Sequence, residues 1–182
     1  MIAAEKLMVA MNKELDKHSF SSITVTSICQ KSHVSRPTFY HHFKSLADLA
    51  VLSIYYRITN DIAELHSWED WLSHLPELID YMQDHRAYFA NTHGSSTVKQ
   101  RAVAYFDHIL HKSVKDYEDQ LNVHLKEEDE LFISHIYSGI FISLFSEYSA
   151  LGTTIDPKFL ATQFRSILED GVERAIRSCV QV

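Results

Sequence analysis

The side chains with the clearest chemical potential lie close together in residues 35–44, SRPTFYHHFK. This segment brings an arginine, two small hydroxyl side chains, a tyrosine and two adjacent histidines into ten residues. Cationic and small polar groups at the start of a helix suit phosphate oxygens and base edges. His41 and His42 project about 100° apart on a helix, so they are poorly placed to share one metal ion. The segment therefore favours nucleic-acid binding over a metal site.

Two short helices and a tight turn must position this segment. Thr24 is a predicted N-cap, and helical spacing of apolar residues continues from it to about residue 32. Ser35 is a second predicted cap, with Pro37 in the first turn of the next helix, where its missing N–H costs nothing. Only residues 32–34 separate the two helices, and a turn of that length sets them at a steep angle. The pattern predicts a helix-turn-helix that follows one further helix.

The charge is divided unevenly along the chain. The net charge is −7, which by itself argues against a nucleic-acid partner. Residues 1–57, however, contain seven basic and four acidic residues, a formal charge of +3, whereas residues 58–182 contain ten and twenty, a charge of −10. A basic head on an acidic body can place one end of the protein against a phosphate backbone.

Composition limits the fold and the chemistry. The 182 residues are 46% hydrophobic and include only four glycines and three prolines, which predicts an all-α protein of about eight or nine helices. Cys29 and Cys179 are far apart and lack metal-ligand spacing. We find no signal peptide, no apolar run long enough to span a membrane, and no paired acid and base. We therefore expect a cytoplasmic protein that is not an enzyme and uses no metal or other cofactor.

The order of segments is more specific than the helix-turn-helix alone. SRPTFYHHF is preceded by ITVTSICQKSHV and followed by KSLADL. Over roughly residues 4–55 this arrangement resembles the N-terminal domain of the TetR family of bacterial transcriptional regulators. The later segment SGIFISLFSEYSALG is faintly similar to regulators of dihydroxyacetone kinase operons. The resemblance implies a DNA-binding domain over residues 1–45, a connecting helix over 45–66, and an effector-binding and dimerisation domain over 46–182.

The resemblance also implies roles for individual residues. Arg36 falls at a base-contacting position, where bidentate binding to guanine is worth about 1–3 kcal/mol of discrimination. Phe39 and Phe43 are expected to point inward. The residues expected to contact the phosphates, sugars or groove of double-stranded operator DNA, or to cap the helices that do so, are Thr24, Thr26, Ser35, Arg36, Pro37, Thr38, Tyr40, His41, His42 and Lys44.

Two positions depart from the family pattern. His33 stands where the turn has glycine, at a position that needs a positive φ. Leu46 stands where the family has a lysine that contacts phosphate. The main interpretation is a homodimeric repressor that responds to an unknown small-molecule effector. The alternative is a co-regulator or protein-interaction module of the same fold that does not recognise DNA by itself.

The acidic body supplies candidates for dimerisation and effector binding. Apolar residues at helical spacing in the last two helices predict a dimer interface or, alternatively, a monomer core: Ile136, Ile140, Phe141, Leu144, Phe145, Tyr148, Phe164, Ile167 and Leu168. The resemblance implies an effector cavity in the middle helices, with candidates Tyr88, Phe89, Tyr105, His108 and Phe132. His108 and His111 are interpreted as surface histidines. The run KEEDE at 126–130 is interpreted as a solvated helix start.

Overall fold

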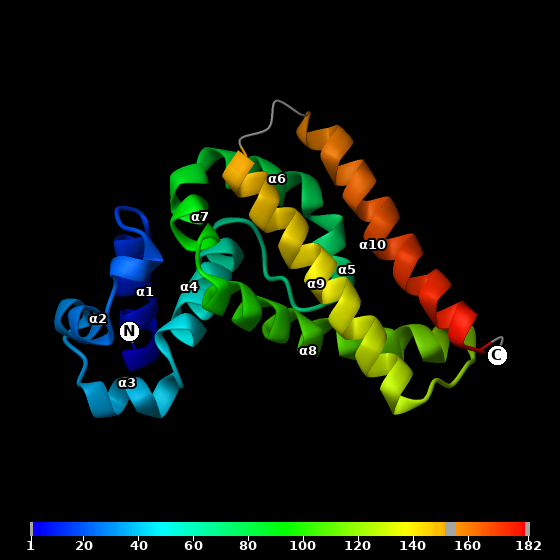
Figure 1. The fold of residues 1–182 in the computed structure, drawn as a ribbon, viewed down its shortest axis with the longest axis horizontal. Helices are drawn as coiled ribbons and strands as arrows, with labels where there is room; N and C mark the ends of the chain where they lie inside the picture. Colours follow the sequence, from blue (N-terminus) through cyan, green and yellow to red (C-terminus); the bar gives the residue numbers. More distant parts are fainter. Residues whose placement is uncertain (1, 152–155, 181–182) are drawn as a thin grey trace. The chain divides into compact units, whose positions relative to one another are not determined.

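The computed structural model describes residues 2–151 and 156–180. Over these residues it contains ten α-helices, one short 3-10 helix at Phe20–Ser22 and no strand, which confirms the all-α prediction (Figure 1). The α-helices are α1 Ala3–Leu15, α2 Val25–Ser32, α3 Arg36–His42, α4 Leu46–Asp61, α5 Trp68–Ser73, α6 Leu75–Asp84, α7 Arg86–His93, α8 Ser96–Leu121, α9 Glu127–Leu151 and α10 Pro157–Val180.

The count exceeds the expected eight or nine because residues 68–93 form three helices. Pro76 lies in the first turn of α6, where its missing N–H breaks no helical hydrogen bond, and Asp84 is the last residue of that helix. The chain therefore leaves the helix once just before Pro76 and again just after Asp84.

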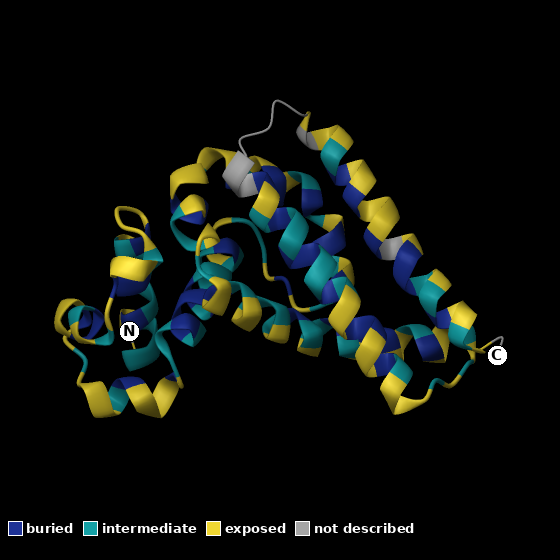
Figure 2. Cartoon of the chain, viewed as in Figure 1, coloured by how far each residue is buried: buried dark blue, intermediate teal, exposed yellow. Residues whose placement is uncertain are grey.

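The helices group into two compact units. Unit 1 comprises Met1–Ala63 and His85–Ala102, and unit 2 comprises Glu64–Asp84 and Val103–Val182. The core of unit 1 includes the fully buried residues Leu7, Met11, Leu15, Ile28, Phe39 and Leu49. The core of unit 2 includes Trp68, Leu75, Leu78, Ile79 and Phe141. Figure 2 colours the buried parts of the helices dark blue. Unit 1 thus extends past residue 45 through α4 and also takes in α7, whereas the functional division at residue 45 stays a prediction.

Within unit 2, α9 and α10 approach closely at one glycine. A Cβ on Gly171 would lie 2.8 Å from the Tyr137 ring and hydroxyl, so a larger residue would force that side chain to move. Burial raises the pKa of the Tyr137 phenol above its ordinary value. Among the described residues, no helix is long and apolar enough to cross a membrane.

Candidate nucleic-acid interface

The turn between α2 and α3 depends on the left-handed conformation of one residue. His33 adopts φ 55° and ψ 36°, and the N–H of Val34 donates to the Cys29 carbonyl at 3.1 Å. This geometry satisfies the free carbonyls at the end of α2, as a glycine C-cap does in other helices. The predicted positive φ at His33 is therefore confirmed. A residue with a Cβ is strained in this backbone conformation, whereas glycine is not.

Side-chain caps fix where the two helices begin. The Thr24 hydroxyl accepts from the Ser27 N–H at 3.1 Å, and the Ser27 hydroxyl accepts from the Thr24 N–H at 3.2 Å. The Ser35 hydroxyl accepts from the Thr38 N–H at 3.2 Å. Both predicted caps are confirmed. They hold the first turns of α2 and α3 in place while leaving the outer faces of both helices unobstructed.

Two phenylalanines hold α3 against the rest of unit 1. Phe39 and Phe43 are buried, as expected from the family pattern, and their ring centroids lie 5.9 Å apart. The Tyr40 ring packs edge-on against Phe39, with 5.1 Å between centroids, yet the residue keeps 51% of its surface exposed. Tyr40 therefore has a supported ring and a hydroxyl available to solvent.

The remaining predicted DNA-contacting side chains lie on the surface of α2, α3 and their flanks (Figure 2). Thr38 is half-buried, and the others are exposed: Thr24, Thr26, Ser35, Arg36, Pro37, Tyr40, His41, His42 and Lys44. We call these ten residues the α3 surface. Residues 17–47 contain four Lys or Arg and no Asp or Glu. The formal charges within this stretch of sequence are therefore all positive, which suits a phosphate backbone.

Ser45 caps the first turn of α4 without forming a capping box with Asp48. The Ser45 hydroxyl accepts from the Asp48 N–H at 3.1 Å. The Asp48 carboxylate, however, accepts from the Ser45 hydroxyl at 2.8 Å and pairs with Arg101 of α8 at 3.2 Å. Leu46, the second departure from the family pattern, is half-buried at the start of this helix.

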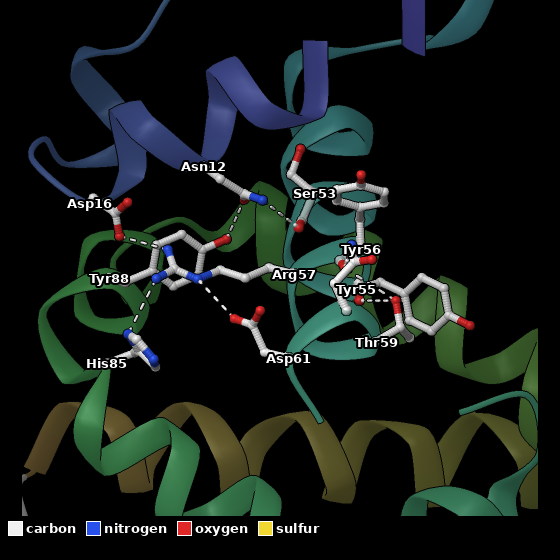
Figure 3. A network of polar contacts seen from close by, with 11 residues as sticks. Asn12, Asp16, Ser53, Tyr55, Tyr56, Arg57, Thr59, Asp61, His85 and Tyr88 are labelled. Atoms are coloured by element: carbon white, nitrogen blue, oxygen red, sulfur yellow. Dashed lines mark hydrogen bonds and ion pairs between the residues drawn. The ribbon is translucent and has the colours of Figure 1, made fainter. Parts of the chain in front are cut away.

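Within unit 1, Arg57 is the centre of a polar cluster that joins α1, α4 and α7 (Figure 3). Its guanidinium group donates to the Asp16 carboxylate at 2.6 Å and to His85 Nδ1 at 3.2 Å. It also lies 4.3 Å from the centroid of the Tyr88 ring, a cation–π contact. Arg57 thus reaches the C-terminal end of α1 and the start of α7 from a single side chain.

The Tyr88 hydroxyl extends this Arg57 cluster into the interior. It donates to Asn12 Oδ1 at 2.7 Å, and the Asn12 amide donates to the Ser53 carbonyl at 3.1 Å (Figure 3). Asn91 donates to the Leu15 carbonyl at 2.8 Å, which adds a second tie between α7 and α1. Sequence reasoning missed this cluster because the residues in contact lie 28 to 76 positions apart and have no common motif.

The five predicted effector-cavity residues are divided between the units. Tyr88 and Phe89 are buried in unit 1, where Tyr88 serves the Arg57 cluster. Tyr105, His108 and Phe132 belong to unit 2, and Phe132 is 66% exposed. Their role in binding an effector stays a prediction.

The predicted dimer residues divide by orientation. Five are buried in unit 2 and fill its core, the alternative that the sequence left open: Phe141, Phe145, Tyr148, Phe164 and Leu168. Four reach the surface in part or in full: Ile136, Ile140, Leu144 and Ile167. Ile136 of α9 and Ile167 of α10 are 42% and 47% exposed. For these four residues, a role in the dimer interface stays a prediction.

The acidic run at the start of α9 is not wholly solvated, contrary to expectation. Glu130 is buried and accepts from His111 Nε2 at 2.8 Å, with Lys115 at 3.4 Å. Hydrogen bonding from His111 holds the pKa of Glu130 below its ordinary value of 4.5, against burial, which acts to raise it. His111 is likewise half-buried rather than a free surface histidine. Among the described residues, no group of three or more His, Cys, Asp and Glu side chains is placed to hold a metal ion.

An all-α fold whose N-terminal helices form a helix-turn-helix with an exposed second helix defines a class of bacterial regulators. Comparison with known families agrees. The model described as "Bacterial regulatory proteins, tetR family" matches residues 7–51, and the model described as "Transcriptional regulator C-terminal region" matches residues 69–170. The chain belongs to the TetR family, as its resemblance indicated.

Solved structures share the fold at low sequence identity. The "Dihydroxyacetone kinase operon activator DhaS" is 17% identical, with a TM-score of 0.57 and coverage of 95% of this chain and 97% of that chain. A TetR transcriptional regulator from Rhodococcus sp. RHA1 is 12% identical, with a TM-score of 0.53 and coverage of 93% and 96%. No curated protein matches the chain.

Proposed function

We propose that this TetR-family protein is a homodimeric repressor that binds operator DNA through the α3 surface and changes its DNA affinity when unit 2 binds a small molecule. The observation that carries the proposal is the α3 surface itself. Exposed Arg36, Tyr40 and Lys44 stand on a helix fixed by buried phenylalanines, in a segment whose formal charges are all positive. Such a surface offers cations for phosphates and a side chain for base edges.

The turn geometry supports DNA recognition by the protein alone. His33 takes the left-handed conformation that glycine takes in the family pattern, so the substitution does not displace α3. Leu46 still removes one expected phosphate contact, and this favours the alternative of a co-regulator that needs a partner. A repressor would bind DNA as a purified protein, whereas such a co-regulator would bind only with its partner.

Dimerisation is supported by apolar side chains that unit 2 leaves exposed on α9 and α10. Phe132, Ile136 and Ile167 are between 42% and 66% exposed. A second copy of the chain would cover the same faces by symmetry. A dimer would also present two α3 surfaces to two half-sites about 34–36 Å apart, as helix-turn-helix readers require. Effector binding would then alter DNA affinity through a coupling of typically 1–3 kcal/mol.

The test is a fluorescence-anisotropy titration of purified protein with the DNA that flanks its own gene. The Arg36→Ala/Tyr40→Ala double variant should bind at least about 100-fold more weakly, because it loses a base contact and a phosphate contact. Arg86→Ala, which removes an exposed arginine on α7, is the matched control and should bind as wild type does. Wild-type affinity in the double variant would show that the α3 surface does not read DNA.

A further inference from the structure

Arg101 of α8 places a positive charge beside the first turn of α4. Its Nε lies 3.2 Å from Asp48 Oδ1, and 48% of its side chain is exposed. Both residues belong to unit 1. Arg101 donates no hydrogen bond to the residues that the structure describes, so the N–H groups of its guanidinium group remain available to a further acceptor.

The Asp48 carboxylate links Arg101 to the end of the α3 surface. Its Oδ1 faces Arg101, and its Oδ2 accepts from the Ser45 hydroxyl at 2.8 Å. Ser45 is the N-cap of α4 and directly follows Lys44, the last residue of the α3 surface. Only one carboxylate therefore separates the Arg101 guanidinium group from the residue next to Lys44, which places this cation at the edge of the α3 surface.

Two acidic residues border the positively charged stretch of residues 17–47, and each is paired with an arginine. Asp16 precedes the stretch and pairs with Arg57 at 2.6 Å, whereas Asp48 follows it and pairs with Arg101. An unpaired carboxylate at either place would repel the phosphates of DNA. Each arginine therefore offsets a negative charge that would oppose DNA binding.

The two arginines differ in what else they contact. The Arg57 side chain is only 17% exposed, and its guanidinium group also donates to His85 and lies over the Tyr88 ring. Arg101 is much more exposed and makes no such additional contact with the described residues. The donors of Arg57 are thus used within unit 1, whereas those of Arg101 can bind an anion from outside the protein.

We propose that Arg101 binds a phosphate of the DNA backbone at the edge of the α3 surface, and that Asp48 is its positioning residue. This contact rests on the proposed function and extends the DNA-binding surface to a helix outside the helix-turn-helix. A guanidinium group suits the role because its planar N–H donors match phosphate oxygens in pairs. The contact compensates for Leu46, which removes one expected phosphate contact. A phosphate contact fixes the position of the protein on DNA and reads no sequence.

The test is a fluorescence-anisotropy titration of the full-length protein with the DNA that flanks its own gene, at about 50 to 200 mM salt. Arg101→Ala should bind at least about tenfold more weakly at the lowest salt, because each subunit loses a phosphate contact. The loss should be equal on unrelated DNA of the same length, since phosphates are the same in every sequence. Lys99→Ala is the matched control. It removes the same charge from the same helix, about 200° around the axis from Arg101, and should bind as wild type does.

A second pair of variants separates phosphate binding from neutralisation of Asp48. Asp48→Asn removes the carboxylate charge, while the asparagine amide can still accept from Arg101 and donate to the Ser45 hydroxyl. In this background Arg101 has no acid to neutralise at this place. Adding Arg101→Ala should still weaken DNA binding about tenfold, and should lower the slope of log K against log salt by about 0.9 per subunit.

Failure of this contact and failure of the proposed function give different results. Loss of affinity from Arg101→Ala in both backgrounds, with Lys99→Ala unchanged, supports the contact. Wild-type affinity in Arg101→Ala, an equal loss in Lys99→Ala, or an effect that disappears in the Asp48→Asn background would overturn it. The proposed function then still stands if Arg36→Ala/Tyr40→Ala abolishes binding. Wild-type protein that binds no DNA overturns the proposed function and the contact together.

Discussion

Arg57 in unit 1 and Trp68 in unit 2 both carry N–H groups into a packed interior, but they meet different surroundings. The Arg57 guanidinium group donates to Asp16 and His85 and lies over the Tyr88 ring. The Trp68 indole N–H finds no acceptor among the described residues. A polar group with several partners holds its helices in one arrangement, because any shift breaks several contacts at once. An unpartnered N–H makes no hydrogen bond that would resist such a shift.

This difference matches the two tasks that we propose for the units. Unit 1 is proposed to present the α3 surface in a fixed orientation, and the Arg57 cluster joins α1, α4 and α7 within that unit. Unit 2 is proposed to bind the effector. Variants that remove the contacts of either unit can break or sharpen this comparison.

The largest effect is expected from Arg57→Ala. The variant loses the ion pair with Asp16, the hydrogen bond to His85 and the cation–π contact, so the free energy of unfolding should fall by about 2 kcal/mol. The expected loss of unfolding free energy is modest because the Asp16 side chain is 43% exposed, and solvent weakens the ion pair. Urea unfolding measures it. The control is Arg174→Ala, an exposed arginine on α10, which should change the free energy by less than about 0.5 kcal/mol. An equal loss in both variants would mean that the cluster does not stabilise unit 1.

A smaller effect is expected from Glu130→Gln, the paired carboxylate of unit 2. The folded-state pKa of Glu130 is lowered, so its stabilising contribution is fully present above the ordinary value of 4.5. At pH 7 the variant should lose about 1–2 kcal/mol of unfolding free energy through the weaker hydrogen bond with His111. As pH falls below 4.5 and through the lowered pKa, the difference from wild type should shrink. Urea unfolding at several pH values checks this, and a difference that grows on acidification would reverse the assigned sign.

The smallest effect is expected at the turn before α3. His33→Gly relieves a left-handed backbone at φ 55° but adds flexibility to the unfolded chain, so a net gain of up to about 1 kcal/mol is expected. Asn122 has a similar φ of 52°, and asparagine tolerates this conformation better. Asn122→Gly should therefore raise the free energy of unfolding by less than His33→Gly does, as measured by urea unfolding. A loss of stability in His33→Gly would show that the histidine side chain itself stabilises the turn.

Sequence patterns predicted the local features of unit 1 well. The caps at Thr24 and Ser35 and the positive φ at His33 each depend on residues within a few positions of one another. Such features follow from side chains that bond their own backbone. The inward orientation of Phe39 and Phe43, which the family resemblance implied, is also found.

Features that depend on tertiary partners were not predictable. Glu130 reads as one acid in a solvated run, and its burial becomes apparent only when α8 places His111 beside it. Tyr88 reads as a ring for an effector cavity, whereas its hydroxyl donates to Asn12, 76 positions earlier. Helical spacing likewise could not separate Phe141, which is buried in unit 2, from the exposed Ile136 on the same helix. Each of these outcomes depends on which helices meet, and periodicity alone does not determine that.

The salt dependence of DNA binding by the purified wild-type protein tests the central claim most directly. Counterion release makes the logarithm of the binding constant fall with the logarithm of salt concentration, by about 0.9 per phosphate neutralised. With two α3 surfaces on two half-sites, we predict nanomolar to micromolar binding at 50 mM salt that weakens about 100-fold or more by 200 mM. Absence of binding by the protein alone, or binding insensitive to salt, would contradict this account and favour a co-regulator that depends on a partner.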